Sequence, residues 1–182
     1  DIIQPIAYDA MGREARKYLP YAANSLNGFY RGSAINDQLL FYTSGVPENI
    51  ATDANPWSEA VFEESPLNRV LQQGSAGSAW QPVTGHPLRY GYATNMSDDV
   101  ILWEVQNDSL FKKSYYFPST LYKTVVKDEN WSEGLLHTTE EYKDLQGNVI
   151  LKRSYIGEVL DTTRTDTYYI YDDFGLLRYV LT

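Results

Sequence analysis

The chain has 182 residues, which suits one domain, or one domain with a few repeat units, and allows a substantial core. Its formal net charge of −9 argues against binding to nucleic acid, which needs a basic surface, and against docking on anionic lipid. Cysteine is absent, which excludes disulfides, and no apolar run approaches the roughly 20 residues of a membrane span. Aromatic residues make up 14% of the chain, which favours β-structure.

The chain opens with a turn phrase that recurs twice. Residues 8–12 read Tyr-Asp-Ala-Met-Gly, residues 171–175 read Tyr-Asp-Asp-Phe-Gly, and a looser copy reads Tyr-Lys-Asp-Leu-Gln-Gly over 142–147. Asp begins a type I turn well because its carboxylate accepts backbone N–H groups, and Gly allows the positive φ of a bulged hairpin. The structural turn residues are therefore Tyr8, Asp9, Gly12, Tyr142, Asp144, Gly147, Tyr171, Asp172 and Gly175.

The first phrase predicts a hairpin over residues 1–22, and residues 23–87 are predicted to be an insertion of ordered loops and short helices. Ser33 can cap a helix that runs through Tyr42. Ile35, Leu39 and Tyr42, at i, i+4 and i+7, would lie on one face of this helix.

A second short helix is predicted after Ser65. Ser65 is a good N-cap, Pro66 suits the first helical position, and Gly74 suits the position just past the end. Leu67, Val70 and Leu71 would form its buried stripe.

From residue 88 onward the pattern predicts an array of hairpins. Strand-like segments 89–94 and 100–105 flank a turn-like insert at 95–99 and are predicted to pair with each other. Further strands are expected at 111–117, 121–127 and 135–142, followed by the two later turn phrases, whose Asp residues lie 28 positions apart. The fold class is thus mainly β: an antiparallel sheet of hairpins with two short helices and long ordered loops. We expect residues 1–182 to be one β-rich module and a segment of a larger protein.

The sequence contains no strong catalytic or metal-binding pattern. Its two histidines, His86 and His137, stand apart, and no Gly-x-Ser-x-Gly elbow or phosphate loop is present. Residues 128–132 start like a calcium loop, but the Gly and Glu that such a loop needs later are missing. The neighbouring glutamates at 140–141 would point to opposite faces of a strand and so cannot act on one bond. We therefore expect no enzyme activity, metal or cofactor.

The aromatic residues allow a second hypothesis. Exposed Trp and Tyr rings can stack on sugars, although packing within and between strands is the more common role of such residues in β-proteins. The candidate ligand-stacking residues are Trp57, Trp80, Trp103 and Trp131.

Residues 171–181 resemble the YD-repeat signature of RHS-repeat proteins, which is Tyr-Asp-x-x-Gly-Arg/Asn-Leu followed by a strand. Residues 8–20 are similar to the same motif with its Gly-Arg intact. Residues 64–71, 142–153 and 166–181 resemble a domain of unknown function that precedes the repeats in large wall-associated RHS proteins of Bacteroides-like bacteria. The chain departs from the signature at Leu176, where Arg or Asn is usual, and at Lys143 in the middle copy.

The resemblance implies a non-enzymatic structural segment of a large exported bacterial protein, located outside the cell or on its surface. In such relatives, hairpins wind into a curved sheet that can close into a shell around a C-terminal toxin or effector. The expected partners are neighbouring repeats of the same polypeptide, with a C-terminal effector or a surface glycan as further partners. The alternative function is a carbohydrate-binding or adhesive surface module that uses exposed Trp and Tyr.

Overall fold

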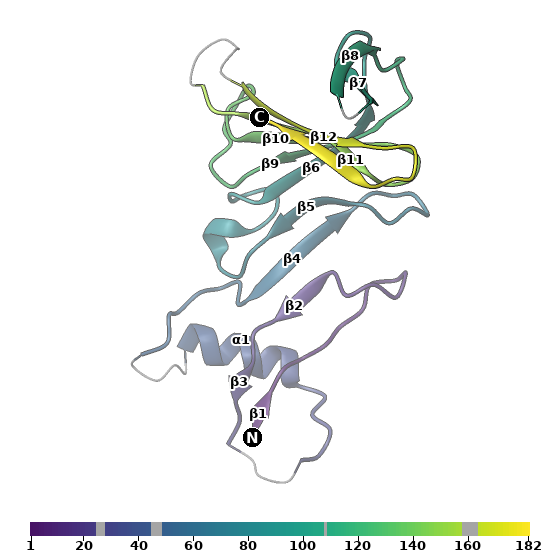
Figure 1. The fold of residues 1–182 in the computed structure, drawn as a ribbon. Coiled ribbons are helices and arrows are strands. Elements are labelled where there is room, and N and C mark those ends of the chain that lie inside the picture. The colour runs from purple at the N-terminus through teal and green to yellow at the C-terminus, as the bar shows by residue number, and fades with distance from the viewer. Residues whose placement is uncertain (25–27, 45–48, 108, 158–163) are drawn as a thin grey trace. The chain divides into compact units, whose positions relative to one another are not determined.

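A computed structural model describes residues 1–24, 28–44, 49–107, 109–157 and 164–182. The chain forms two compact units, Asp1–Leu88 and Arg89–Thr182. Antiparallel β-structure dominates both units, as the sequence predicts (Figure 1). The described residues contain one α-helix and one 3-10 turn, so the prediction of two short helices is only partly right.

Unit 1 consists of short antiparallel strands and the helix. Strand β1 pairs with β3, and β4 lies between β2 and β5. The first turn phrase closes a hairpin that is marked by a bridge between Ile6 and Lys17. The elements are β1 (Ile2–Ile3), β2 (Arg16–Tyr18), β3 (Tyr21–Ala22), α1 (Ala34–Ser44), β4 (Trp57–Phe62), β5 (Val70–Gly74) and the 3-10 turn η1 (Ser78–Trp80).

Helix α1 forms where the sequence predicts it, but of the three residues on its predicted face only Tyr42 is buried. Ile35 and Leu39 are 39% and 36% exposed, whereas Gln38 is fully buried beside Tyr42. The amide of Gln38 donates to the carbonyl of Pro56 at 2.6 Å, and the Tyr42 hydroxyl donates to that of Pro20 at 2.7 Å. Gln38 lies beside the predicted face and Tyr42 belongs to it, so hydrogen bonds to backbone carbonyls hold this side of the helix.

The predicted helix after Ser65 is wrong, because this stretch forms a turn and then strand β5. The Ser65 hydroxyl accepts a hydrogen bond from the Leu67 amide, which satisfies a turn rather than a helix N-terminus. Asn68 then takes a left-handed conformation with φ of 52° and reverses the chain. The Arg69 guanidinium binds Glu63 across this turn at 2.7 Å, which fixes the β4–β5 hairpin.

Gly74 is required by a close backbone approach and not by the end of a helix. A Cβ atom at this position would lie 2.3 Å from the carbonyl oxygen of Trp80 and 2.8 Å from Cδ of Pro82. The segment after η1 therefore packs directly on the backbone of β5.

Unit 2 is a larger antiparallel sheet with one hairpin standing over it. The strands follow the order β6-β9-β10-β11-β12-β13, and β7 pairs with β8 as a separate hairpin (Figure 1). The elements are β6 (Leu88–Thr94), β7 (Ile101–Gln106), β8 (Ser109–Tyr115), β9 (Tyr122–Lys127), β10 (Thr138–Lys143), β11 (Val149–Tyr155), β12 (Arg164–Tyr171) and β13 (Leu177–Leu181).

The predicted pairing of segments 89–94 and 100–105 is wrong. Strand β6 pairs with β9, and β7 pairs with β8. The cause is Asn95, which is 2% exposed and whose side-chain oxygen accepts the backbone N–H groups of Thr120 and Leu121. Its amide group donates to the carbonyl of Phe117 at 2.8 Å. These long-range hydrogen bonds hold residues 117–121 next to the end of β6, so that β7 and β8 form a separate hairpin between the two paired strands.

The core of unit 2 lies between the sheet and the β7–β8 hairpin. Trp103 of β7 meets Tyr168 of β12 edge-on, with ring centroids 6.1 Å apart. The Ile101 amide donates to the Tyr168 hydroxyl at 3.4 Å. The buried members of this core are Val100, Leu121, Tyr142, Ile150, Leu151, Tyr168 and Ile170.

We predict that Gly74→Ala destabilises unit 1 by about 1–3 kcal/mol, because the new methyl group has no space beside backbone atoms. Urea unfolding measures this loss. Gly32→Ala is the matched control, since the nearest atom to its Cβ would be a ring carbon of Tyr30 at 3.9 Å. Equal effects of the two substitutions would contradict the close approach.

Candidate functional site

The three turn phrases form the same hydrogen-bonded structure. In each, Oδ1 of the Asp accepts backbone N–H groups two and four residues later, at 2.9 and 2.9 Å for Asp9, 2.9 and 2.8 Å for Asp144, and 3.0 and 3.0 Å for Asp172. The Gly three residues later donates back to the Asp carbonyl, with φ of 77°, 89° and 77°. The carboxylate therefore sits inside the turn and stabilises its backbone.

The three turns also set the same strand register. The residue three positions before the Asp pairs with the residue eight positions after it: Ile6 with Lys17, Glu141 with Lys152, and Tyr169 with Val180. The two later hairpins share a register shift as well, between Tyr142 and Lys143 and between Ile170 and Tyr171. The hairpins are thus copies of one unit in backbone geometry.

The side chain four residues after the Asp decides how fully the carboxylate is bound. Arg13 donates to Oδ2 of Asp9 at 2.8 Å, and the amide of Asn148 donates to Oδ2 of Asp144 at 2.9 Å. Leu176 cannot do this, and Arg178 approaches Asp172 at 3.4 Å instead. This contact gives a physical reason for Arg or Asn after the Gly of the signature.

The turn hydrogen bonds lower the pKa of two of these carboxyls. The backbone N–H of Arg13 is the largest cause for the lowered pKa of Asp9, followed by its guanidinium. The backbone N–H of Leu176 is the largest cause for the lowered pKa of Asp172, partly opposed by desolvation. Both carboxyls therefore stay ionised at neutral pH as hydrogen-bond acceptors.

The tyrosines of the phrases occupy different environments. Tyr8 is 68% exposed and Tyr171 is half-buried, and each directly precedes its Asp. Tyr142 lies two residues before its Asp rather than directly before it as in the signature. It therefore takes the position in its hairpin that Ile170 takes in the hairpin of Asp172. Because strand residues alternate between faces, this shift turns Tyr142 inward, where it is fully buried.

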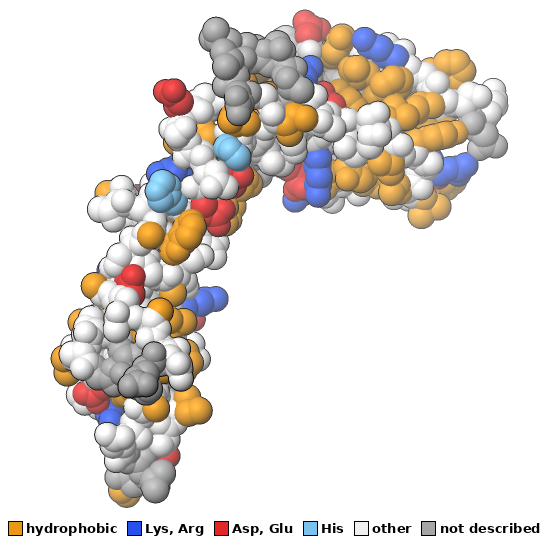
Figure 2. Space-filling view, turned by 90° about the vertical axis from the view of Figure 1, so that its left-hand side faces the viewer, with side chains coloured by type: hydrophobic (Ala, Val, Ile, Leu, Met, Phe, Trp, Pro, Cys, Tyr) orange, Lys and Arg blue, Asp and Glu red, His pale blue; other side chains and the backbone are white. Residues whose placement is uncertain are grey.

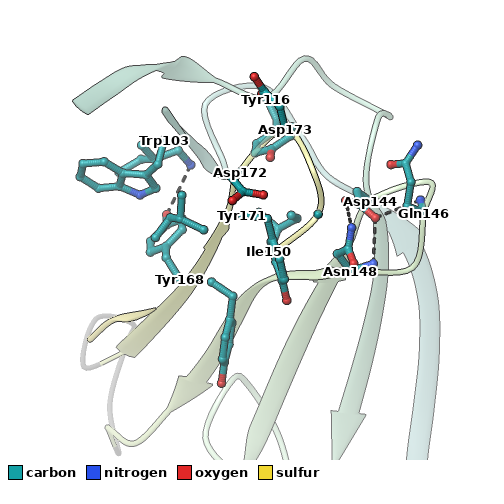
Figure 3. A pocket seen from close by; sticks show the side chains of 14 residues that line it. Trp103, Tyr116, Asp144, Gln146, Asn148, Ile150, Tyr168, Tyr171, Asp172 and Asp173 are labelled. Carbon is teal, nitrogen blue, oxygen red and sulfur yellow. Dashed lines mark hydrogen bonds between the residues drawn. The ribbon is translucent and has the colours of Figure 1, made fainter. Parts of the chain in front are cut away.

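A cleft of about 410 Å³ lies where the two later turns meet the β7–β8 hairpin (Figure 3). Asp172 and Asp144 lie on two sides of it, and Tyr116 and Asp173 lie at one end (Figure 3). Burial raises the pKa of Tyr116, and the charge of Asp144 adds to this shift. Other residues that line the cleft are Trp103, Gln146, Asn148, Ile150, Tyr168 and Tyr171.

A row of alternating charges crosses the buried face of the same sheet. Glu140 on β10 pairs with Arg153 on β11, which pairs with Asp166 on β12. Lys123 on β9 extends the row and lies 2.6 Å from Oε1 of Glu140. Arg153 is 2% exposed and binds both oxygens of Asp166, at 2.8 and 3.0 Å. We call these four residues the charge row.

Asp99 connects the charge row to the β7–β8 hairpin. It precedes β7, and its Oδ1 accepts a hydrogen bond from Arg153 at 2.7 Å. The Tyr142 hydroxyl lies 3.0 Å from Oδ2 of Asp99 and 2.8 Å from Glu140. Burial raises the pKa of Tyr142, with a further rise from Glu140, so this hydroxyl remains a donor. Burial opposes ionisation of Arg153, but hydrogen bonds to Asp166 and Asp99 outweigh it and raise its pKa.

Sequence reasoning missed the charge row and most of the cleft. Arg153 does alternate with Leu151 along its strand, which signals a shared face. The carboxylates that neutralise it, however, come from positions 13 and 54 residues away in the chain. No local pattern relates these positions.

The four tryptophans have separate neighbours. In unit 1, Trp57 donates to Glu59 at 3.1 Å beneath the Arg16 guanidinium, and Trp80 is 43% exposed beside His86. In unit 2, Trp103 packs on Tyr168, and Trp131 lies against Lys127, whose Nζ is 3.6 Å from the ring centroid. Of these, Trp103 lines the cleft.

Within the described ranges, no group of three His, Asp or Glu side chains is arranged to hold a metal ion. His137 approaches Asp128 at 3.1 Å on the surface, and His86 contacts Trp80. On the face shown in Figure 2, Lys and Arg are scattered among acidic and neutral side chains. No helix in the described part of the chain is long and apolar enough to span a membrane.

We predict that Leu176→Asn raises the midpoint of urea unfolding of unit 2 slightly. The new amide can donate to Oδ2 of Asp172, as Asn148 does to Asp144, and Leu176 is 61% exposed, so little apolar burial is lost. Leu176→Ala is the control because it removes the same side chain without adding a donor. If both variants unfold at the same urea concentration, a donor four residues after the Asp does not stabilise the turn.

We predict that Arg153→Met costs about 3–5 kcal/mol, because it leaves buried carboxylates without their cation. Lys152→Met is the matched control, because Lys152 is next to Arg153 in the chain but is exposed and pairs with Glu141 at 3.2 Å. This substitution should cost less than about 1 kcal/mol. Urea unfolding of both variants measures the difference. Similar losses would mean that the charge row adds nothing beyond a surface pair.

The pH dependence of unfolding provides a separate prediction. Burial alone would raise the pKa of Asp99, but hydrogen bonds from Arg153 and Tyr142 hold it below its ordinary 3.8. A folded-state pKa below the unfolded one gives stability that is present above pH 3.8 and lost as pH falls through the folded pKa. We expect the stability of the wild-type chain to fall in this acidic range, and that of Arg153→Met to fall less steeply. Parallel pH profiles would contradict this coupling.

Comparison with known proteins gives one match. A family model described as Domain of unknown function (DUF6443) matches residues 1–94, just over half of the chain. The match includes the first turn phrase and residues 64–71, whereas the two later phrases lie outside it. No curated protein and no solved structure matches the chain. With its N-terminal half matched in this way, the chain belongs to the DUF6443 family of unknown function.

Proposed function

We propose that this chain is a non-enzymatic structural segment of a large exported bacterial protein of the RHS/YD-repeat type. Its role is to contribute hairpins to a curved β-sheet. The observation that carries the proposal is the repetition of one turn, with the same carboxylate-to-amide hydrogen bonds and the same strand register, at Asp9, Asp144 and Asp172. A hairpin with fixed register can be stacked on its neighbour repeatedly, which is how repeat proteins grow.

Strand β13 provides the place where such a sheet would continue. It pairs with β12 on one side, and the described residues supply no strand on its other side. Natural proteins usually protect such edges with proline, bulges or charges. Residues 177–181 contain no proline and a single charged residue, Arg178, while Leu177 and Val180 are each 50% exposed. A neighbouring repeat of the same polypeptide would cover this edge.

The location and cargo of the proposed protein follow from the resemblance of residues 8–20 and 171–181 to YD repeats. We place the segment outside the cell or on its surface, in Bacteroides-like bacteria. There the completed sheet would form a scaffold, or a shell around a C-terminal effector. The buried charge row supports a mechanical role, because it ties four strands of the sheet into one cluster.

We predict that alternate amides of β13 exchange rapidly with solvent in the 182-residue chain, because the described residues place a strand on only one side of it. In a longer polypeptide that continues beyond Thr182, the same amides should be protected by at least tenfold. Hydrogen exchange followed by NMR or mass spectrometry measures both. Unchanged exchange of β13 would overturn the repeat-segment function, and amides of β11, which pair on both sides, serve as the internal control.

Export is tested separately by labelling intact producing cells with an antibody raised against the chain. Labelling without permeabilisation is expected, together with loss of the signal after brief protease treatment. Signal that appears only after lysis would contradict a surface or extracellular location.

A further inference from the structure

We propose that the cleft between the two later turns and the β7–β8 hairpin binds a neutral oligosaccharide. This ligand site does not depend on the repeat-segment function, which concerns the edge of the sheet and leaves the cleft unused.

The shape of the region favours an extended ligand. A second hollow of about 410 Å³ runs along β7 and shares Trp103, Tyr171, Asp172 and Asp173 with the cleft. Each hollow falls within the roughly 300–1,000 Å³ typical of small-molecule sites. Two adjoining hollows with a common wall fit two linked rings better than one compact molecule.

The walls combine flat apolar surfaces with polar groups. Trp103, Tyr116 and Tyr171 contribute aromatic rings, which pack well against the C–H faces of sugars. Gln146 and Asn148 carry amides that both donate and accept hydrogen bonds. Carboxylates of the two turns add acceptors for hydroxyl groups.

The carboxylates are held in place before any ligand arrives. Oδ1 of both Asp144 and Asp172 is engaged by turn amides at 2.8–3.0 Å, so neither side chain can rotate freely. Each Oδ2 has one protein donor in the described structure and keeps a second acceptor position, since a carboxylate oxygen can accept two hydrogen bonds. Binding therefore needs little ordering of these groups.

The charge of the walls distinguishes among ligand classes. No Lys, Arg or His lines the first hollow, and Lys113 of the second is paired with Glu104 at 2.8 Å, which disfavours an anionic ligand. Within the described residues, the carboxylates do not form a group that could hold a metal ion. The amides of Gln146 and Asn148 line the cleft and can donate to a ligand hydroxyl, whereas an ammonium group has no acceptor for them. A neutral polyhydroxyl ligand therefore fits better than a cation.

The test is titration of the 182-residue chain with glucose, galactose, mannose, N-acetylglucosamine and a β-linked disaccharide of each. Calorimetry and NMR of the tryptophan indole N–H groups are the readouts. We expect at least one disaccharide to bind more tightly than its monosaccharide and to shift the Trp103 signal while leaving that of Trp131 unchanged. Failure of every sugar to bind at about 20 mM would overturn the proposal.

Two variants and two matched controls test the place of binding. Gln146→Ala and Asp173→Ala remove side chains that line the cleft and should each weaken binding at least fivefold. Leu145→Ala and Phe174→Ala alter the neighbouring residues of the same turns, which are 73% and 90% exposed and do not line the cleft, and should leave binding unchanged. Equal effects in both pairs would overturn the site. If spermidine binds in a saturable, salt-sensitive way and no sugar binds, the oligosaccharide proposal is overturned and the cleft is a site for an organic cation.

Discussion

The structure depends on one local interaction: an aspartate carboxylate that accepts two backbone N–H groups of the turn it begins. Asp9, Asp144 and Asp172 all make it, and each thereby fixes a Gly with positive φ three residues later. Because such a turn sets the register of the strands on either side, a short motif determines which residues face each other for the whole length of a hairpin.

That register has consequences far from the turns. With the Asp144 turn in place, Glu140 lies opposite Arg153, and Tyr142 lies opposite Leu151 on the buried face. A slip of one residue would turn Arg153 toward solvent and bring Lys152 into the core, which would leave the charge row without its centre. The charge row therefore favours one strand register, because only this register places the Arg153 guanidinium beside the carboxylates that bind it.

The functional hypotheses follow from the same arrangement. The turns that would let hairpins stack into a longer sheet also place Asp144, Asp172 and Asp173 around the cleft beneath the β7–β8 hairpin. A structural segment and a sugar-binding surface are thus compatible in one molecule, because the turn uses one carboxylate oxygen and leaves capacity on the other. The charge row strengthens this arrangement by tying Asp99, just before β7, to Arg153 in the sheet.

The sequence by itself determined the mainly β class, the helix near Tyr42 and the positions of the turn phrases, because each rests on preferences of neighbouring residues. It did not determine that residues 70–74 are a strand, since Ser65 and Pro66 favour a turn as readily as a helix start. It also could not pair β6 with β9, because that choice is made by the contact of Asn95 with residues 117–121. The cleft and the charge row likewise join residues that are distant in the chain. Tertiary structure decided these features, since burial and pairing depend on partners that no local pattern specifies.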